Sequence, residues 1–505
     1  MATFYIKKKA SSKALFRKCQ KSMQTQGFEF HPYQKQGILW MIKQEQNTQH
    51  KIRGGLLCDE MGLGKTVQTI SLICARPLKK RKTLIVVPCS VLFQWQNEFT
   101  KFAPHIKTQV HHGKTKIHFL STPTFQNADV IITTYGTLSS RKKQTILHKH
   151  TWGRIILDEC HSIRNHKCKR AKSCCLIKAK HKWGLTGTPI QNYKTDLYSL
   201  FMYLGLSKTF VKNNIDDVRD TYILRRTKKE VHIQLPKKMV ECVEIPFETR
   251  FEEDFYLKIR DNVLKEIGAF QSFDRISINA VLEHIMRLRQ ATIHPQLVID
   301  GYSKKYNKLP SISEIDIPTK MNYIIKTLKK EYLENKEQKT IIFCSFIKEI
   351  DILEHHLETS HFRTARIDGS INPSERIKII KNASSFDILL VQIDAGGTGL
   401  TMTHFHRIFF MSPSWNPCLE RQAIARAHRI GQEKNVKITR LFVVLNNDTI
   451  LQSKNKTNAK TIDELIKVKQ DNKKLMIIEM LQDNSYFEYK PKETRTRDDL
   501  FQYVK

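Results

Sequence analysis

The stretch GGLLCDEMGLGKTVQTI, residues 54–70, decides how this chain is organised. It runs from an apolar segment through a glycine-rich turn into residues that favour a helix. Backbone N–H groups of such a turn can wrap a phosphate, and the helix that follows presents the positive end of its dipole to the anion. We therefore predict a phosphate-binding loop between a buried strand and a helix, as in parallel α/β sheets.

The predicted loop brings together residues that would hold ATP and a magnesium ion. Lys65 adds a point charge for the phosphates, and Thr66 supplies a hydroxyl for Mg²⁺. The usual pattern has a glycine five residues before Gly64, and Asp59 takes that place here. A turn that binds nothing is disfavoured because strand, GKT and helix coincide. The residues expected at the nucleotide are Asp59, Gly62, Leu63, Gly64, Lys65 and Thr66.

A carboxylate pair follows a second apolar run in RIILDECH, residues 154–161. A nucleotide hydrolase needs one carboxylate for the metal and another for water, ideally at the end of a strand that neighbours the phosphate-loop strand. Asp158 would hold Mg²⁺ through water, and Glu159 would position and deprotonate the attacking water. An isolated pair of this kind is typical of a solvated turn, but its place downstream of GKT predicts ATP hydrolysis.

Positive charge for the γ-phosphate is predicted from SWNPCLERQAIARAHRIGQ, residues 414–432. Arg426 and Arg429 are spaced i and i+3, and Gln422 lies one turn earlier, so we place all three on one helical face. Arginines at this position are worth on the order of 10³ to 10⁵ in rate. A solvated basic helix is the alternative interpretation.

Apolar runs rich in Val, Ile and Leu alternate with amphipathic stretches, as expected for parallel sheets wrapped by helices. The first set of predicted strands comprises residues 55–58, 83–87, 130–133, 154–157 and 183–186. The second set comprises residues 340–344, 363–367, 388–391, 407–411 and 437–443. We therefore predict an α/β protein with two parallel-sheet lobes in tandem and helical insertions between them.

The region between these two sets is helical and charged in pattern, and the stretch 300–317, which contains Gly301 and Pro310, is the predicted linker. The predicted organisation is a basic N-terminal segment (1–28), a first lobe (29–205), helical insertions and linker (206–318), a second lobe (319–455), and a C-terminal brace and tail (456–505).

The charge balance indicates a polyanionic partner. The chain has 85 Lys and Arg against 49 Asp and Glu, a formal charge of +36, which favours nucleic acid over a merely solvated surface. No apolar run approaches the roughly 18 residues of a membrane span, and no basic amphipathic helix with a strong apolar face stands out, so we expect no membrane partner. The cluster Cys168, Cys174 and Cys175 lacks CxxC spacing, which favours buried thiols over zinc.

A series of motifs in fixed order resembles the SWI/SNF-family ATPases of helicase superfamily 2. The resemblance covers residues from about 30 to 440, and RLRQATIHPQLV with LRRTKKEV is more specific than general helicase motifs. The RING insert common in relatives with the RLRQ block is absent, so we do not expect ubiquitin-ligase activity. The other matching blocks are HPYQKQGILWM, VVPCSVLFQWQNEF, VIITTYGTL, LTGTPIQN, IIFCSF, RIDGS, QIDAGGTGL and RQAIARAHRIGQ.

The resemblance implies two RecA-like lobes and a DNA-dependent ATPase that moves along double-stranded DNA as a monomer. It implies that Gln34 reads adenine and that Thr186 and Thr188 couple hydrolysis to lobe movement. Trp95 is equally consistent with a packed core residue, and Ser345 with the end of its strand. The residues that the resemblance places along DNA are Ser90, Gln94, Trp95, Thr134, Tyr135, Ser345, Gly397 and Thr398.

Two positions depart from the family's usual pattern. Asp394 precedes AGG where a basic residue is usual, and Thr401 replaces an asparagine, which puts that loop's contact with the DNA backbone in question. A strand-separating helicase and a non-catalytic DNA-binding scaffold remain as alternatives. The partners implied are nucleosomes, RNA polymerase or other DNA-bound proteins, in the nucleus or, for a viral chain, in a viral factory or virion.

Overall fold

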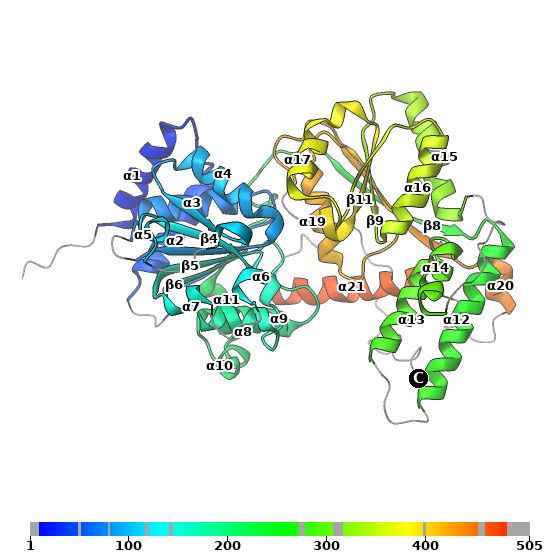
Figure 1. Ribbon diagram of the computed structural model, residues 1–505, viewed down its shortest axis with the longest axis horizontal. Coiled ribbons are helices and arrows are strands. Elements are labelled where there is room, and N and C mark those ends of the chain that lie inside the picture. Colours follow the sequence, from blue (N-terminus) through cyan, green and yellow to red (C-terminus); the bar gives the residue numbers. More distant parts are fainter. Residues whose placement is uncertain are drawn as a thin grey trace, which may run out of the picture. The chain divides into compact units, whose positions relative to one another are not determined.

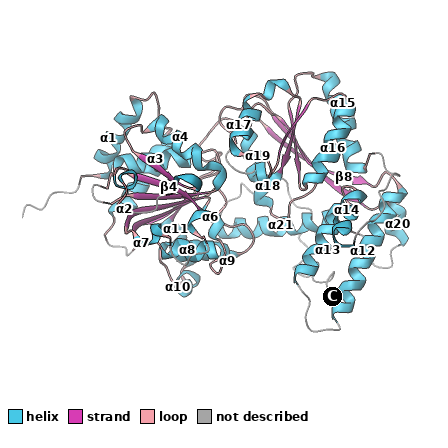
Figure 2. Ribbon diagram, in the orientation of Figure 1, coloured by secondary structure: helices cyan, strands magenta, loops and turns pink. Residues whose placement is uncertain are grey.

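The structure is a computed structural model that describes residues 10–48, 52–78, 81–116, 121–140, 145–271, 278–306, 317–396, 400–452 and 460–481. The chain divides into two compact units, Met1–Gln234 and Leu235–Lys505, which we call lobe 1 and lobe 2. Each contains a sheet with helices packed around it (Figures 1 and 2). No helix in these described ranges is long and apolar enough to cross a membrane.

Lobe 1 is built on a seven-stranded sheet with the order β3-β4-β2-β5-β6-β1-β7. Every pairing among its described strands is parallel, so the carboxyl ends of the strands meet at one edge. The strands are β1 (Gly54–Leu57), β2 (Thr83–Val87), β3 (Thr108–His111), β4 (Val130–Thr134), β5 (Trp152–Asp158), β6 (Ala179–Leu185) and β7 (Ile223–Leu224).

The helices of lobe 1 bury the apolar side chains of the central strands. The sequence of β2, TLIVV, is buried along its whole length, as expected for a parallel strand covered on both faces. One core cluster joins Ile38, Ile70 and Trp95 from three helices to Ile85 and Ile132 from the sheet. The longer helices are α1 (Ser12–Gln24), α2 (Pro32–Gln46), α3 (Lys65–Ala75), α4 (Leu92–Phe102), α8 (Lys169–Leu176), α9 (Lys194–Leu204) and α11 (Ile215–Tyr222).

Lobe 2 has a six-stranded sheet with the order β10-β11-β9-β12-β13-β8, also parallel throughout its described pairings. Its strands are β8 (Lys238–Pro246), β9 (Thr340–Cys344), β10 (Thr364–Ile367), β11 (Ile388–Gln392), β12 (Arg407–Phe410) and β13 (Val436–Val444). Its longer helices are α12 (Arg250–Gln271), α13 (Ile278–Ala291), α14 (Pro295–Tyr306), α15 (Thr319–Glu334), α16 (Ile347–Thr359), α17 (Pro373–Lys381), α19 (Pro417–Ala427) and α21 (Ile462–Leu481). The predicted α/β class with two parallel-sheet, RecA-like lobes is confirmed.

Each of the ten predicted strands overlaps an observed one, but the helical, charged pattern predicted over 206–318 is incomplete, because this region also contains the strands β7 and β8. The strand β8 lies inside that region and pairs with β13 at the edge of the lobe 2 sheet. Apart from Ile245, its residues are partly buried or exposed. Its sequence KMVECVEIP accordingly mixes charged and apolar residues and lacks the continuous apolar run of a central strand. Its run of Val240, Val243 and Ile245, which includes β-branched residues typical of strands, is the signal that could have found it.

The predicted linker at 300–317 is wrong for its first part, because α14 continues to Tyr306. Gly301 lies within this helix and does not end it, as a single glycine costs a helix only about 1 kcal/mol. Residues 307–316 lie outside the described part of the chain. The helix α21 lies in the segment predicted to be the brace and tail (456–505), and residues 456–459 and 482–505 of that segment lie outside the described part of the chain.

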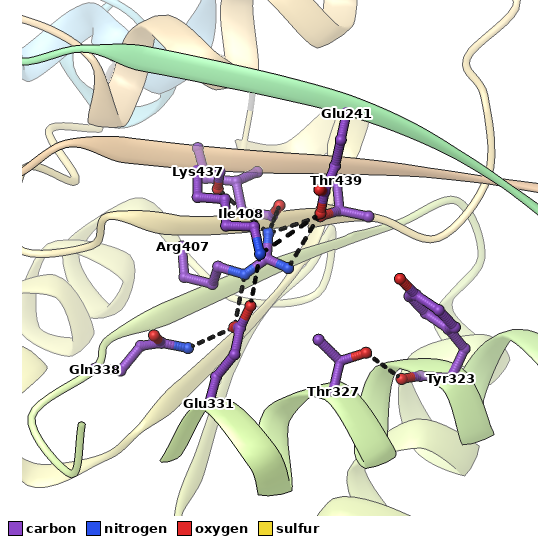
Figure 3. A network of polar contacts seen from close by, with 9 residues as sticks. All are labelled: Glu241, Tyr323, Thr327, Glu331, Gln338, Arg407, Ile408, Lys437 and Thr439. Carbon is purple, nitrogen blue, oxygen red and sulfur yellow. Dashed lines mark hydrogen bonds and ion pairs between the residues drawn. The ribbon is translucent and has the colours of Figure 1, made fainter. Parts of the chain in front are cut away.

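Each lobe has a buried ion pair at the amino edge of its sheet. In lobe 1, Arg154 at the start of β5 donates to Glu45 on α2 at 2.6 and 2.7 Å. In lobe 2, Arg407 at the start of β12 donates to Glu331 on α15 at 2.8 Å, and Lys437 reaches the same carboxylate at 3.0 Å. Figure 3 shows these side chains converging between α15 and the strands. Both pairs fasten a helix to its sheet.

Candidate active site

The phosphate loop connects β1 to α3, and its shape depends on glycine. Gly64 is the N-cap of α3 and has a left-handed backbone with φ +74°. A Cβ atom there would lie 2.7 Å from Gln34 Nε2. Gly62 is also left-handed, with φ +92°. L-residues with side chains avoid this conformation, so the glycines match the predicted loop.

The residues of this loop fit a bound phosphate. No side chain caps the N-terminus of α3, which leaves backbone N–H groups of the first turn available to an anion. Lys65 begins that helix, and its Nζ donates to the carbonyl oxygen of Asp59 at 2.8 Å. Gln34 Oε1 accepts from the N–H of His31 at 3.1 Å, which orients the amide of Gln34 beside Gly64. The predicted nucleotide residues of the loop thus lie together, but the side chain of Asp59 is buried and bonded to Arg226 and Gln68, so its place in the predicted nucleotide set is not supported.

The predicted carboxylate pair lies one strand further from the phosphate loop than expected. The strand β6 lies between β1 and β5, and Leu57, Leu185 and Asp158 form one row across the three strands. The expectation that the two strands are neighbours is therefore wrong. Two strand spacings separate Leu57 from Asp158, about 10 Å, and this leaves the end of β6, with Thr186, between the two motifs.

Asp158 is held by two aromatic side chains. Trp95 Nε1 donates to its Oδ2 at 2.7 Å, and the hydroxyl of Tyr135 donates to its carbonyl oxygen at 2.7 Å. Burial, and then the adjacent charge of Glu159, raise the pKa of Asp158 to about 6. A divalent cation would offset both effects, because it favours the ionised carboxylate. These residues therefore fit a metal ion bound to nucleotide.

Glu159 is connected to the loop after β6 through a histidine. It has a left-handed backbone with φ 48°, which is uncommon outside glycine and often found at functional sites. His161 Nδ1 lies 3.3 Å from Glu159 Oε2 and 3.0 Å from Thr186 Oγ1. Thr186 Oγ1 in turn accepts from the N–H of Thr188 at 3.1 Å. His161 was missed as a functional residue, although it stands in the DECH motif.

The residues expected along DNA are placed in different environments. Trp95 and Tyr135 are 2% and 4% exposed, and Thr134 is also buried. The burial of Trp95 and its bond to Asp158 favour the packed-residue alternative. Ser90 is partly exposed and Gln94 exposed, near the start of α4, so they remain candidates for DNA contact. Gly397 and Thr398 lie outside the described residues.

In lobe 2, Ser345 follows β9 and accepts a hydrogen bond from Arg289 Nη2 at 3.0 Å. Arg289 belongs to the RLRQ block on α13, so this block packs against the loop after β9. Its guanidinium also lies 5.7 Å from the ring centre of Phe346. The hydroxyl of Ser345 thus has a partner within its own lobe, while the side chain stays partly exposed.

The prediction that Gln422, Arg426 and Arg429 share one helical face is wrong for Arg429. The helix α19 ends at Ala427 with His428 as its C-cap, so Arg429 lies beyond it. The chain turns there, and Gly431 has φ +96°. Arg429 Nη1 donates to Thr401 Oγ1 at 3.0 Å. Thr401, one of the atypical positions, therefore contacts a predicted catalytic arginine, and Asp394, the other, is exposed.

The three cysteines considered for zinc lie at or within α8 in different environments. Cys174 is buried and Cys175 is exposed, while Cys168 Sγ accepts from the N–H of Ala171 at the start of the helix. Within the described ranges, no three His, Cys, Asp or Glu side chains are grouped so that they could hold a metal ion.

Two protein-family models match this chain. The SNF2-related domain matches residues 33–214 and 208–297, more than half of the chain, and the helicase conserved C-terminal domain matches residues 319–431. The chain belongs to the SWI/SNF family of helicase-like ATPases. Both family matches fall on the two α/β lobes described above.

Similar proteins include three curated relatives. The DNA excision repair protein ERCC-6-like of Danio rerio is 28% identical, and the TATA-binding protein-associated factor MOT1 of Saccharomyces cerevisiae is 29% identical, over 82% and 81% of this chain. An uncharacterized ATP-dependent helicase of Mycoplasma pneumoniae is 32% identical over 81% of this chain. The chain spans 34%, 26% and 39% of the length of these relatives.

A solved SWI2/SNF2 ATPase core of Sulfolobus solfataricus in complex with dsDNA is 26% identical. The alignment covers 90% of this chain and 96% of that one, with a TM-score of 0.40.

Proposed function

We propose that this SWI/SNF-family chain is a DNA-dependent ATPase that couples ATP hydrolysis to translocation along double-stranded DNA and so displaces or remodels bound protein complexes. The observation that carries the proposal is the connected set of side chains at the carboxyl edge of lobe 1. There the phosphate loop, the Asp158–Glu159 pair and the Thr186–Thr188 loop are joined through the row of β1, β6 and β5 and through His161.

The chain's own residues account for the chemistry of the hydrolytic step. Glu159 accepts a proton from the attacking water, and His161 holds its carboxylate toward Thr186. Bound Mg²⁺ would neutralise phosphate charge, with Thr66 and Asp158 as its protein-side partners. Trp95 and Tyr135 keep Asp158 in place. Thr186 and Thr188, which are connected to Glu159 through His161, would then couple hydrolysis to movement of the lobe.

The choice of DNA as partner is supported by charge and by the relatives. A formal charge of +36 suits a chain that follows a phosphate backbone. Two of the relatives are named as a DNA excision repair protein and a TATA-binding protein-associated factor. Ser90 and Gln94 are the proposed contacts in lobe 1, and Arg426 and Arg429 are the proposed arginines for the γ-phosphate.

ATP turnover with and without nucleic acid tests the proposal. We expect duplex DNA to raise turnover several-fold and Lys65→Ala to reduce it to background, because the loop would lose its charge for the phosphates. Lys172→Ala, at an exposed lysine on α8 of the same lobe, is the matched control and should keep its turnover. Equal stimulation by RNA alone would overturn the choice of DNA.

Translocation and strand separation give different products. We expect the chain to displace a triplex-forming strand from a duplex but to leave a forked duplex paired, and the opposite result would select the helicase alternative. Binding should also weaken with salt, by roughly 10³ to 10⁵ between 50 and 200 mM for six to ten phosphate contacts. A flat salt response would contradict a motor that follows the backbone.

A further inference from the structure

Two consecutive arginines of the LRRTKKEV block, Arg225 and Arg226, contact Cys58 and Asp59 at the start of the phosphate loop in lobe 1. They follow β7, which pairs with the phosphate-loop strand β1. Backbone bonds continue this pairing past the strand ends, from Cys58 N to Leu224 O at 2.7 Å and from Glu60 N to Arg226 O at 2.9 Å. The block therefore runs alongside the first half of the phosphate loop.

Arg226 binds the residue that replaces the usual glycine of the loop. Its Nε lies 2.9 Å from Asp59 Oδ1, and its Nη2 contacts Asp59 Oδ2 and, at 3.1 Å, Gln68 Oε1. Its Nη1 also contacts the carbonyl oxygen of Tyr33, next to Gln34. The guanidinium thus contacts the phosphate loop, the helix α3 that follows it, and the backbone next to Gln34, the residue predicted to read adenine.

The carboxylate of Asp59 faces the protein interior. Its side chain is fully buried, and Gln68 Nε2 donates to its Oδ2 at 3.1 Å and to Leu63 O at 3.2 Å. A buried carboxylate without a cation would be strongly unfavourable, and Arg226 supplies that cation. On the main chain, the carbonyl of Asp59 accepts from Lys65. Asp59 therefore links Arg226 to the phosphate-binding lysine.

Arg225 joins a different pair of loops. Its Nη1 donates to Cys58 O at 2.9 Å and to Gly187 O at 3.1 Å. Cys58 follows β1, and Gly187 lies between Thr186 and Thr188. A single side chain thus ties the start of the phosphate loop to the loop that is connected to Glu159 through His161.

We propose that Arg225 and Arg226 are positioning residues for ATP hydrolysis. Arg226 holds the phosphate loop in its binding shape through Asp59, and Arg225 holds the Thr186–Thr188 loop in register with that loop. The inference rests on the proposed function, because it assigns these residues to the same ATP site. It also gives the LRRTKKEV block a role within lobe 1. Measurements of nucleotide binding and of turnover can test the two arginines separately.

The two arginines should affect different kinetic constants. We expect Arg226→Gln to raise KM for ATP, and Arg225→Gln to lower kcat with little change in KM. Each change should be about tenfold to a hundredfold, the loss expected when a charge-assisted hydrogen bond is removed. Arg226→Lys keeps the charge and should recover part of the KM loss. Unchanged KM and kcat in both glutamine variants would overturn the proposal.

A double variant separates positioning from folding, because Arg226→Gln alone leaves Asp59 buried without its cation. Arg226→Gln with Asp59→Asn removes both charges and should recover the unfolding temperature but not the KM for ATP. The matched control is Arg154→Gln with Glu45→Gln, a buried pair at the opposite edge of the same sheet. That control should leave KM unchanged, and wild-type KM in the Arg226 and Asp59 double variant would contradict the proposal.

Direct binding of ADP with Mg²⁺ distinguishes failure of this inference from failure of the proposed function. If wild type binds ADP but hydrolyses no ATP with any nucleic acid, the proposed function fails. The Arg226→Gln and Asp59→Asn double variant then still tests the positioning role, because it should bind ADP about tenfold or more weakly than wild type. Equal affinity would overturn the inference.

Discussion

The two lobes place buried charge at both edges of their sheets, but the carboxyl edges hold different elements. At the amino edges, Arg154–Glu45 in lobe 1 and Arg407–Glu331 in lobe 2 both fasten a helix to the sheet. At the carboxyl edge of lobe 1, Arg226–Asp59 supports the phosphate loop. At the carboxyl edge of lobe 2, the buried Lys320 pairs at 2.6 Å with Asp463 on α21.

This difference shows how one architecture serves two purposes. The amino edges need only structural stability, so their ion pairs join regular elements. At the carboxyl edges the strands end in loops, where backbone groups are less constrained and functional residues gather. Lobe 1 uses its carboxyl-edge pair to shape a binding loop, and lobe 2 uses its own to attach the C-terminal helix α21.

Breaking the pair at the carboxyl edge of lobe 2 should have the largest effect on stability. Lys320→Met removes the paired cation from the buried Asp463, which keeps neutral donors such as the N–H of Val443 at 3.1 Å, and should cost about 3 to 5 kcal/mol in unfolding free energy. Amide exchange of α21 should accelerate with it. The control Lys467→Met removes an ion pair between α21 and the exposed Glu244 and should cost under about 1 kcal/mol. Unchanged exchange in Lys320→Met would show that α21 is held by other contacts.

Two buried groups, one in each lobe, should make the free energy of unfolding change in opposite directions on acidification. Burial lowers the pKa of His181 in lobe 1 to about 4, and burial raises the pKa of Glu349 in lobe 2 to about 7. Because unfolded His181 takes a proton near pH 6.5, its contribution to stability is lost between pH 6.5 and 4. Folded Glu349 takes its proton before the unfolded chain does, so stability is gained as pH falls from 7 to 4.5. Each contribution is about 3 kcal/mol.

Difference measurements isolate these two groups from others that titrate, such as Asp158. Denaturant unfolding of His181→Leu and Glu349→Gln is compared with wild type between pH 4 and 8. His181→Leu should reduce the loss on acidification, and Glu349→Gln should stabilise lobe 2 most at pH 8. Glu349 accepts from the N–H groups of Ser345 and Phe346, which glutamine can still satisfy. Parallel pH profiles of all three proteins would contradict the assignment.

Breaking the Arg407–Glu331 pair at the amino edge of lobe 2 should have the smallest effect on stability among the changes to buried groups proposed for that lobe. Arg407→Met leaves Glu331 with Lys437 at 3.0 Å and Gln338 at 2.9 Å, so we expect a loss of about 1 to 2 kcal/mol in unfolding free energy. Arg363→Met, which removes a mostly exposed arginine from Asp387, is the control and should destabilise the protein less than Arg407→Met, because solvent screens an exposed ion pair. If Arg407→Met lost as much unfolding free energy as Lys320→Met, the proposed difference between the amino and carboxyl edges of lobe 2 would be wrong.

Sequence alone determined the features that depend on neighbours along the chain. The ten predicted strands are apolar because they are buried in parallel sheets, and Gly62 and Gly64 stand where the backbone is left-handed. The phosphate loop, the DE pair and the family follow from contiguous motifs. Such signals are readable because their physical causes, burial on both faces and steric limits on φ, act within a few residues.

Only the tertiary structure decided which motifs meet. Sequence does not state that β6 separates β1 from β5, because crossover connections can pass over a neighbouring strand. It does not pair Asp59 with Arg226, which lie 167 residues apart. Nor does it show that Trp95 points inward to Asp158 or that Arg429 lies past the end of α19. These contacts depend on how distant segments pack, and the free energy of packing is a property of the folded chain.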